Sequence, residues 1–314
     1  MIESLYTIIS SNNPNLFFLR WVLLLAIIMV IIVVSKQMQT PYKPEGFTQV
    51  EPFVYKYGNN IFDKFYVDIY DSLHNTRVRA TQELLKIIDM TEPSVNHSTF
   101  LDVGCGTGYA VNELTQAGYE VYGVDNSKEM LTYAMQKYPD AEYIYGDVVN
   151  PMQFEKSRFT HILCTYFTIY YIENKDKFFQ NCYFWMKPNT YLVLHLVDTT
   201  KFTNLIPHEN ALIEENKLPT KRLITSNAIF SDYKYKCSYE IPRDGNNIQT
   251  EIKETFTDID SGHIRQNEIH LHLDSIDNIL YKVTQAGFIM HGKVDMSTCN
   301  GDVHQFLYIL ERPL

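Results

Sequence analysis

One long apolar run stands out near the start of the chain. Residues 16 to 34 read LFFLRWVLLLAIIMVIIVV, and only Arg20 interrupts them. In a helix this run would be about 28 Å long, which matches the hydrocarbon thickness of a bilayer. No basic stretch precedes it and no small-residue cleavage pattern follows, so a cleaved signal peptide is disfavoured. The pattern predicts a transmembrane helix at 16–35 after a tail at 1–15, with a buried helix as the alternative.

The charges that flank this run indicate its orientation. Lys36, Lys43 and Lys56 follow it, whereas Arg20 lies near its N-terminal end. The positive-inside tendency therefore places the C-terminal part of the chain in the cytoplasm of a single-pass membrane protein. Residues 36–60 contain three prolines and are expected to form a linker.

Beyond residue 61, helix-like and strand-like segments alternate. Apolar residues recur at helical spacing in 63–90, 110–117, 127–137 and 174–186. Short apolar strands are expected at 99–103, 120–124, 142–145, 159–165 and 190–197. This rhythm predicts an α/β fold, with a mostly parallel sheet and helices on both of its faces.

The rhythm changes after the fifth of these strands. Polar and apolar residues alternate at 234–241 and 262–273, and a turn signal stands at 244–247, which is typical of antiparallel strands. A helix at 273–286 and strands at 288–295 and 305–311 then resume the earlier pattern. We therefore expect one domain built from 61–198 and 273–314, with a β-rich cap inserted at 199–272.

Composition narrows the classes of function. The net charge is −10, and Lys and Arg are scattered, which disfavours a nucleic-acid substrate. Five cysteines lie far apart, without the spacing of a metal site or of a disulfide framework. His270 and His272 would share one strand face but have no evident third ligand, so we predict no metal site.

The segment most indicative of chemistry is LDVGCGTG, residues 101–108. Glycines placed between a strand and a helix let a ligand approach the backbone and the free N–H groups of the helix. A dinucleotide-binding loop would read GxGxxG, but here the third glycine, Gly108, comes one residue early. Asp102 would repel a pyrophosphate, whereas its carboxylate can pair with an ammonium group. The motif thus favours a cofactor that carries an amino acid moiety.

Two further aspartates end the next two strands. Asp125 in YGVDNS could accept both hydroxyls of a ribose, or it could cap the following helix. Asp147 in GDV could accept from an adenine amine while Val148 packs on the ring, or it could be an ordinary turn residue. Because carboxylates follow three successive strands, a single binding site is the better interpretation.

Taken together, DVGCGTG, GVDNS, GDV and MKPNTYLVLHLVD resemble the class I S-adenosylmethionine-dependent methyltransferases. The resemblance covers about residues 98–198 and 275–313. It implies a Rossmann-like sheet of seven strands whose last strand is antiparallel, and S-adenosylmethionine as the cofactor. It also implies that Asp102, Gly104 and Gly106 surround the methionine part. The candidate cofactor-binding residues are Asp102, Gly104, Cys105, Gly106, Gly108, Asp125, Asn126, Asp147, Val148 and Cys164.

The acceptor of the methyl group is not defined by these motifs. His195 and Tyr166, which end the fifth and fourth strands, are the candidate catalytic residues, although a buried and satisfied sheet histidine is an equal alternative for His195. Similar family members place inserts over small-molecule substrates, whereas a membrane anchor would favour a lipid or a protein. A catalytically inactive, membrane-tethered binding module is the rival function. The oligomeric state is left open.

Overall fold

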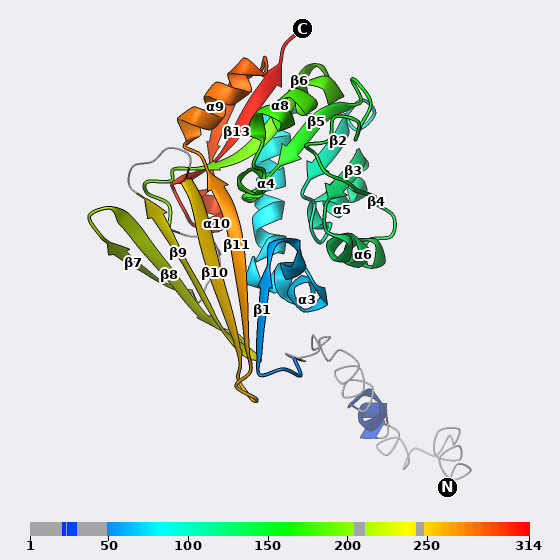
Figure 1. Ribbon diagram of the computed structural model, residues 1–314. Coiled ribbons are helices and arrows are strands. Elements are labelled where there is room, and N and C mark those ends of the chain that lie inside the picture. Colours follow the sequence, from blue (N-terminus) through cyan, green and yellow to red (C-terminus); the bar gives the residue numbers. More distant parts are fainter. Residues whose placement is uncertain (1–20, 23, 30–48, 204–210, 243–247) are drawn as a thin grey trace, which may run out of the picture. The chain divides into compact units, whose positions relative to one another are not determined.

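The computed structural model describes residues 21–22, 24–29, 49–203, 211–242 and 248–314 (Figure 1). The chain divides into two compact units, Met1–Gly46 and Phe47–Leu314. In the first unit, residues 21–22 and 24–29 are helical and exposed. Among the described residues, no helix is both long and apolar enough to span a bilayer. The expected tail at 1–15 and most of the expected span at 16–35 lie outside the described residues.

A mixed sheet of seven strands forms the larger half of the second unit. Its strands are β2 (Thr99–Val103), β3 (Glu120–Asp125), β4 (Glu142–Tyr145), β5 (Phe159–Cys164), β6 (Met186–Val197), β12 (Ile289–Asp295) and β13 (Gln305–Arg312). They lie in the order β12-β13-β6-β5-β2-β3-β4. The four pairings that do not involve β13 are all parallel, and β13 is antiparallel to both of its neighbours. The expected Rossmann-like methyltransferase sheet is therefore confirmed.

Helices cover both faces of this sheet. On one face, α4 (Thr76–Thr91) and α5 (Tyr109–Gln116) pack against β2 and β6 through side chains such as Ile87 and Val111. On the other face, α8 (Lys175–Trp185) and α9 (Ile276–Gln285) bury Phe178 and Ile279. All five residues of β2 are buried, as expected for a central strand covered on both sides. Helix α6 (Lys128–Lys137) follows β3, and α10 (Ser297–Asn300) lies between β12 and β13.

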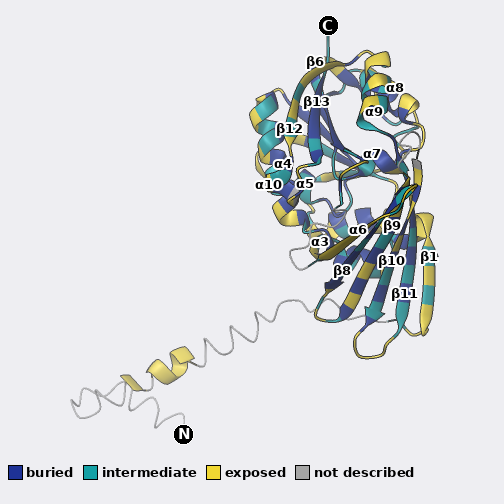
Figure 2. Ribbon diagram, turned by 90° about the vertical axis from the view of Figure 1, so that its left-hand side faces the viewer, coloured by how far each residue is buried: buried dark blue, intermediate teal, exposed yellow. Residues whose placement is uncertain are grey.

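A second sheet of six strands forms the cap. A meander of β7 (Leu212–Lys217), β8 (Lys221–Ile229), β9 (Tyr233–Pro242), β10 (Ile248–Asp258) and β11 (Ile264–Leu273) is antiparallel throughout. Buried and exposed residues alternate along its central strands, so one face packs inward and the other meets solvent (Figure 2). The predicted turn at 244–247 lies outside the described residues.

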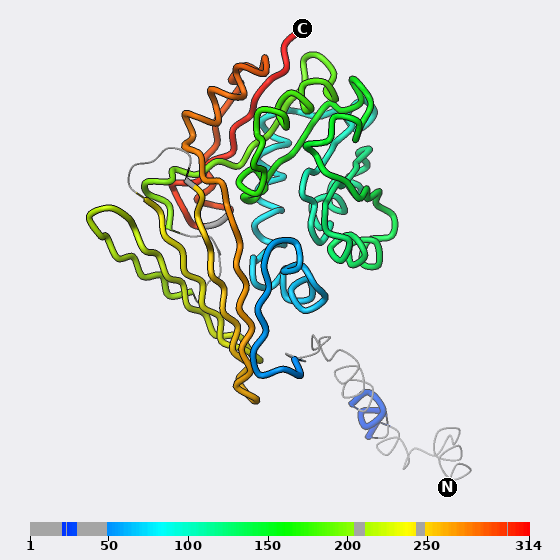
Figure 3. Tube along the Cα trace, viewed as in Figure 1, coloured from blue at the N-terminus to red at the C-terminus, as the bar shows by residue number. Residues whose placement is uncertain are grey.

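The expected linker at 36–60 is wrong in its last part. Residues Phe53–Tyr57 form strand β1, which pairs in parallel with β11 and so completes the cap sheet (Figure 3). A 3-10 turn, Gly58–Ile61, follows directly. The sequence FVYKY alternates like a strand, but its partner lies about 200 residues further along the chain, and no local pattern reveals such a pairing.

Helix α3 (Lys64–Leu73) connects the cap to the seven-stranded sheet. Asp63 caps the helix, and both of its carboxylate oxygens accept from Nη1 of Arg265 of β11, at 2.9 and 2.8 Å. Phe256 of β10 packs edge-on against Phe65 and Tyr66, with ring centroids 5.5 and 6.1 Å apart. These contacts fix the direction in which α3 presents its remaining aromatic residues.

Candidate active site

A cavity of about 500 Å³ opens at the carboxyl ends of β2, β3 and β4. Parallel α/β sheets bind ligands at this edge, because the loops that follow the strands converge there. Its walls come from the glycine loop, the ends of β3 and β4, the β5–α8 connection and the cap. The lining residues include Val103, Gly104, Gly106, Asp125, Asn126, Asp147, Val148, Thr168, Tyr70, Tyr171 and Ile269.

The glycine loop forms the floor of this cavity. Gly104 and Gly106 have φ values of +67° and +52°, a region that side chains with a Cβ rarely adopt. A Cβ at Gly104 would lie 2.7 Å from the Thr168 side chain, whereas one at Gly106 would project toward open space beside Tyr70. Gly108 has a different role, since a Cβ there would collide with Tyr143 and Ala134 behind the loop. Gly104 and Gly106 both line the cavity, and of the three glycines only Gly106 has open space where a side chain would stand.

Asp125 lies between the glycine loop and the next helix. One of its oxygens accepts from the Gly106 N–H at 2.9 Å, and the other accepts from the Ser127 N–H at 2.8 Å. Ser127 caps α6, so Asp125 does not serve as the helix cap. Burial raises the pKa of Asp125. Its remaining lone pairs can accept the hydroxyls of a sugar, and Asn126 lines the cavity beside it.

Asp147 and Val148 line the cavity at the end of β4. Asp147 is exposed and accepts from the Val149 N–H at 2.9 Å, while Val148 is half-buried. The Val148 carbonyl accepts from the Asn181 side chain of α8, which holds this turn in place. An aromatic base could therefore lie against Val148, with Asp147 at its polar edge.

Asp102 is the buried carboxylate directly before the loop. Within the described part of the chain, no side-chain hydrogen bond to it is found. Burial, followed by the nearby carboxylates Glu83 and Asp125, raises the pKa of Asp102 to about 7. A buried carboxylate of this kind is stabilised by a cationic partner. The ammonium group of an amino acid moiety fits this requirement, in agreement with the inference from the motif.

Four of the predicted cofactor residues do not line the cavity: Asp102, Cys105, Gly108 and Cys164. Cys105 and Cys164 are buried, and the Cys105 sulfur would lie 2.9 Å from a Cβ at Gly123. All five cysteines are free thiols, as their spacing indicated. These two side chains support the loop and the strand from behind.

The residues after β5 have an unusual backbone. Tyr166 and Phe167 have φ values of +43° and +61°, which is uncommon for large side chains and costs about 1–3 kcal/mol each. The Phe167 N–H donates to Nδ1 of His195 at 3.2 Å, and Nε2 of His195 lies 3.0 Å from Oε1 of Gln305. This pair of bonds requires a neutral ring with its proton on Nε2. His195 thereby fixes the strained turn.

His195 does not reach the cavity. Its side chain is fully buried, and burial lowers its pKa to about 3. With both ring nitrogens occupied, it cannot take a proton from a substrate. The geometry favours the alternative that the sequence left open, a satisfied sheet histidine, and corrects the catalytic role that was expected for it.

An inner pocket of about 50 Å³ lies beyond the main cavity. Tyr70, Tyr171 and Ile269 line both spaces and separate them. Tyr166, the other predicted catalytic residue, lines the inner pocket only, together with Tyr66, His74, Phe167, Cys237, Ile252, Glu254 and Leu271. His74 and Glu254 were not expected from the sequence. His74 directly follows α3 and Glu254 lies on β10, and no local signal connects them.

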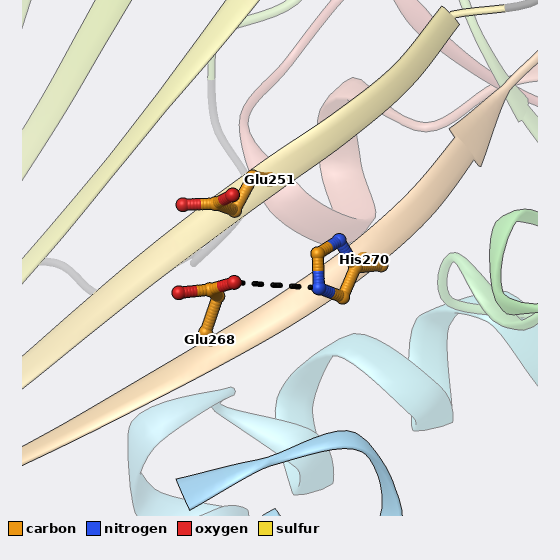
Figure 4. A group of neighbouring side chains, drawn as sticks. All are labelled: Glu251, Glu268 and His270. Atoms are coloured by element: carbon orange, nitrogen blue, oxygen red, sulfur yellow. Dashed lines mark ion pairs between the residues drawn. The ribbon is translucent and has the colours of Figure 1, made fainter. Parts of the chain in front are cut away.

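A group of polar side chains on the cap reaches the main cavity through His270. Glu251, Glu268 and His270 approach one another, and His270 Nε2 lies 3.4 Å from a Glu268 oxygen (Figure 4). His272, the other histidine considered from the sequence, is not part of this group. Exposed carboxylates gather in this way without a bound ion, and we assign no metal to them.

Comparison with known proteins agrees with this geometry. Residues 101–194 match the family described as "Methyltransferase domain". The CcbJ methyltransferase from Streptomyces caelestis superposes with a TM-score of 0.61 at 13% identity, covering 82% of this chain and all of that one. An S-adenosylmethionine-dependent methyltransferase from Clostridium acetobutylicum gives 0.55 at 16% identity, covering 80% and 98%. The second unit has the class I methyltransferase fold. These likenesses also support S-adenosylmethionine as the cofactor.

The matches in sequence to curated proteins cover only part of this chain. A malonyl-[acyl-carrier protein] O-methyltransferase from Pectobacterium atrosepticum is 33% identical over 81 residues, which are 26% of this chain and 30% of that protein. A dTDP-3-amino-3,4,6-trideoxy-alpha-D-glucopyranose N,N-dimethyltransferase from Streptomyces venezuelae is 30% identical over 90 residues, or 28% and 38%. The chain thus spans about a third of the length of these curated relatives, and their acceptors differ in chemistry.

Proposed function

We propose that this protein is an S-adenosylmethionine-dependent methyltransferase that acts on a small molecule, which enters between the cap sheet and the seven-stranded sheet. The observation that carries the proposal is the cavity at the ends of β2, β3 and β4, which Asp125 and Asp147 line, with the buried Asp102 of β2 two residues before Gly104. The position of the cap supports a small acceptor, because the inner pocket admits only a small group.

The cofactor would supply an electrophilic methyl group on a sulfonium. In this proposal the Asp102 carboxylate binds its ammonium group, and Gly104 and Gly106 leave room for the methionine part. Asp125 holds the ribose hydroxyls, and Asp147 with Val148 receives the adenine. Tyr70 and Tyr171 then orient the acceptor and exclude water, which accounts for much of the catalysis in a displacement of this type.

Titration calorimetry with S-adenosylmethionine and S-adenosylhomocysteine tests the cofactor site. In Asp125→Asn one carboxylate oxygen becomes an amide NH2 group, which cannot accept a hydrogen bond from a ribose hydroxyl, so the Kd should rise by about 10–100-fold. The matched control is Asp176→Asn, which changes an exposed carboxylate on α8 that pairs with Lys282. No binding by the unaltered protein at millimolar ligand would refute the proposal.

Binding alone does not distinguish an enzyme from an inactive module. Transfer of a labelled methyl group to a small-molecule extract would establish an enzyme, whereas tight binding without labelled product would favour the inactive binding module.

The proposal includes a membrane anchor at 16–35 with the catalytic domain in the cytoplasm. The apolar run and the basic residues that follow it support this part. Carbonate extraction of membranes from expressing cells tests it, since complete release into the supernatant would exclude an integral anchor.

A further inference from the structure

The inner pocket contains a continuous chain of hydrogen bonds. The Tyr166 hydroxyl lies 2.9 Å from His74 Nδ1, and His74 Nε2 lies 3.5 Å from the Tyr66 hydroxyl. The Tyr66 hydroxyl in turn donates to Glu254 at 3.1 Å. The chain thus runs from the strained turn after β5, across α3, to a buried carboxylate on β10.

The direction of donation along this chain follows from its last member. Because Tyr66 gives its proton to Glu254, it can only accept from His74, whose proton must then be on Nε2. Nδ1 of His74 is left as an acceptor for the Tyr166 O–H. Burial lowers the pKa of His74 to about 3, so the ring is neutral, as this arrangement requires.

The terminal carboxylate is suited to receive a proton. Glu254 is almost fully buried, and burial raises its pKa. Tyr66, Tyr235 (2.8 Å) and Asn267 (3.1 Å) donate to it, and Arg265 acts on it electrostatically while pairing with Asp63. No Lys or Arg lines the inner pocket, and the nearby Arg79 guanidinium, 3.5 Å from the Tyr166 ring centroid, is paired with Glu83 at 2.8 Å.

These surroundings discriminate between acceptors by charge. A carboxylate acceptor would be placed near Glu254 with no basic group lining the pocket to neutralise it. An ammonium group, in contrast, meets a carboxylate and several aromatic faces, which attract cations. An amine is also the acceptor that must lose a proton before its nitrogen can attack.

We propose that the acceptor is a small basic amine, and that the chain Tyr166–His74–Tyr66–Glu254 takes up the proton that the amine loses before methyl transfer. This inference rests on the proposed function. The ammonium gives a proton to the Tyr166 oxygen as the Tyr166 proton passes to His74 Nδ1. The Nε2 proton moves to Tyr66, and the Tyr66 proton moves to Glu254, which becomes neutral. The nitrogen lone pair then forms the bond to the methyl carbon, and the electron pair of the broken S–C bond stays on sulfur.

Binding to the protein saturated with S-adenosylhomocysteine tests the acceptor class. Propylamine, 1-propanol and propionate have the same carbon chain and differ in charge, and their affinities can be measured by NMR titration at pH 8. Propylamine should bind at least about tenfold more tightly than propionate, and Glu254→Gln should remove this preference. Equal or tighter binding of propionate, or no binding of propylamine, would overturn the inference.

Proton uptake by Glu254 can be followed without turnover. Infrared difference spectra on adding propylamine should show a new protonated-carboxyl band in the unaltered protein and none in Glu254→Gln. Tyr66→Phe and Tyr235→Phe each remove one hydrogen bond to the same Glu254 oxygen, but only Tyr66 belongs to the chain. The band should therefore be lost in Tyr66→Phe and kept in Tyr235→Phe. The same band in both variants would show that the proton does not travel through Tyr66.

The outcome also separates this inference from the proposed function. If S-adenosylhomocysteine does not bind, the proposed function itself fails. If it binds but propylamine is not preferred, the methyltransferase assignment stands and only the amine class and its proton path are wrong.

Discussion

At the scale of single residues, the site depends on a few groups whose burial changes their chemistry. Asp102 and Glu254 are carboxylates held in surroundings that raise their pKa, and His74 and His195 are histidines held neutral. In each case burial is the largest cause, because it disfavours the charged form of the group. A cationic ligand would lower the pKa of the two carboxylates again, because it stabilises their ionised form.

Cofactor binding should therefore depend on pH through Asp102. In the free protein its pKa is raised to about 7, so a proton must leave when an ammonium binds at lower pH. The affinity should fall by about tenfold per pH unit below pH 7. Calorimetry between pH 5.5 and 7 in two buffers of different ionisation enthalpy measures both the affinity and the released proton. Asp102→Asn should bind weakly and without this slope, and an equal slope in the variant would contradict the assignment.

At the scale of elements, the position of α3 decides which side chains meet. The pair between Asp63 and Arg265 and the packing on Phe256 hold α3 against the cap. As a result, the helix places Tyr66 and His74 in the inner pocket and Tyr70 between the two spaces. Periodicity predicted the helix and its apolar face, but a helical pattern does not specify the partner on which that face packs.

Strand β1 should contribute to the stability of the cap. A chain that begins at residue 47 keeps β1, whereas one that begins at residue 58 leaves the β11 edge without its parallel partner. Unpaired edges lose hydrogen bonds and promote association between copies. We expect the shorter chain to unfold several degrees lower and to scatter more light, as measured by thermal unfolding with parallel light scattering. Equal melting temperatures for the two chains would show that β1 is dispensable.

At the scale of the whole molecule, buried histidines should make the folded protein less stable as the pH falls. His161 stacks on Phe100 with ring centroids 4.4 Å apart, and its Nε2 is buried without a hydrogen-bond partner among the described residues. Burial lowers the pKa of His161 to about 4. Between pH 6.5 and 4 the unfolded chain therefore binds a proton that the folded protein excludes, and stability decreases as the pH falls.

Replacing this histidine should flatten the pH dependence. His161→Phe removes the titrating ring while keeping an aromatic side chain against Phe100. Between pH 7 and pH 5 the free energy of unfolding should decrease in both proteins. The decrease should be smaller in the variant than in the unaltered protein by about 2 kcal/mol. Urea unfolding at both pH values measures this difference. His97→Asn, which alters an exposed histidine, is the control and should leave the slope unchanged. An unchanged slope in His161→Phe would mean that other groups cause the acid sensitivity.

The sequence by itself determined the fold class and the position of the cofactor cavity. Strand β2, the three glycines and the aspartates after β2, β3 and β4 are local signals, and parallel topology brings strand ends to one edge whatever the details of packing. The cap was also predicted from local signals, because polar and apolar residues alternate along its strands. Local patterns carry this information because the period of hydrophobic residues is set by the geometry of each element.

Only the tertiary structure decided which side chains meet. It showed that His195 supports the turn of Tyr166 and Phe167, that β1 belongs to the cap, and that His74 and Glu254 share the inner pocket. The hydrogen bond between Tyr66 and Glu254 joins residues that are 188 positions apart. Contacts at such separations depend on how two sheets and a helix pack in space, and hydrophobic periodicity along the chain does not encode that packing.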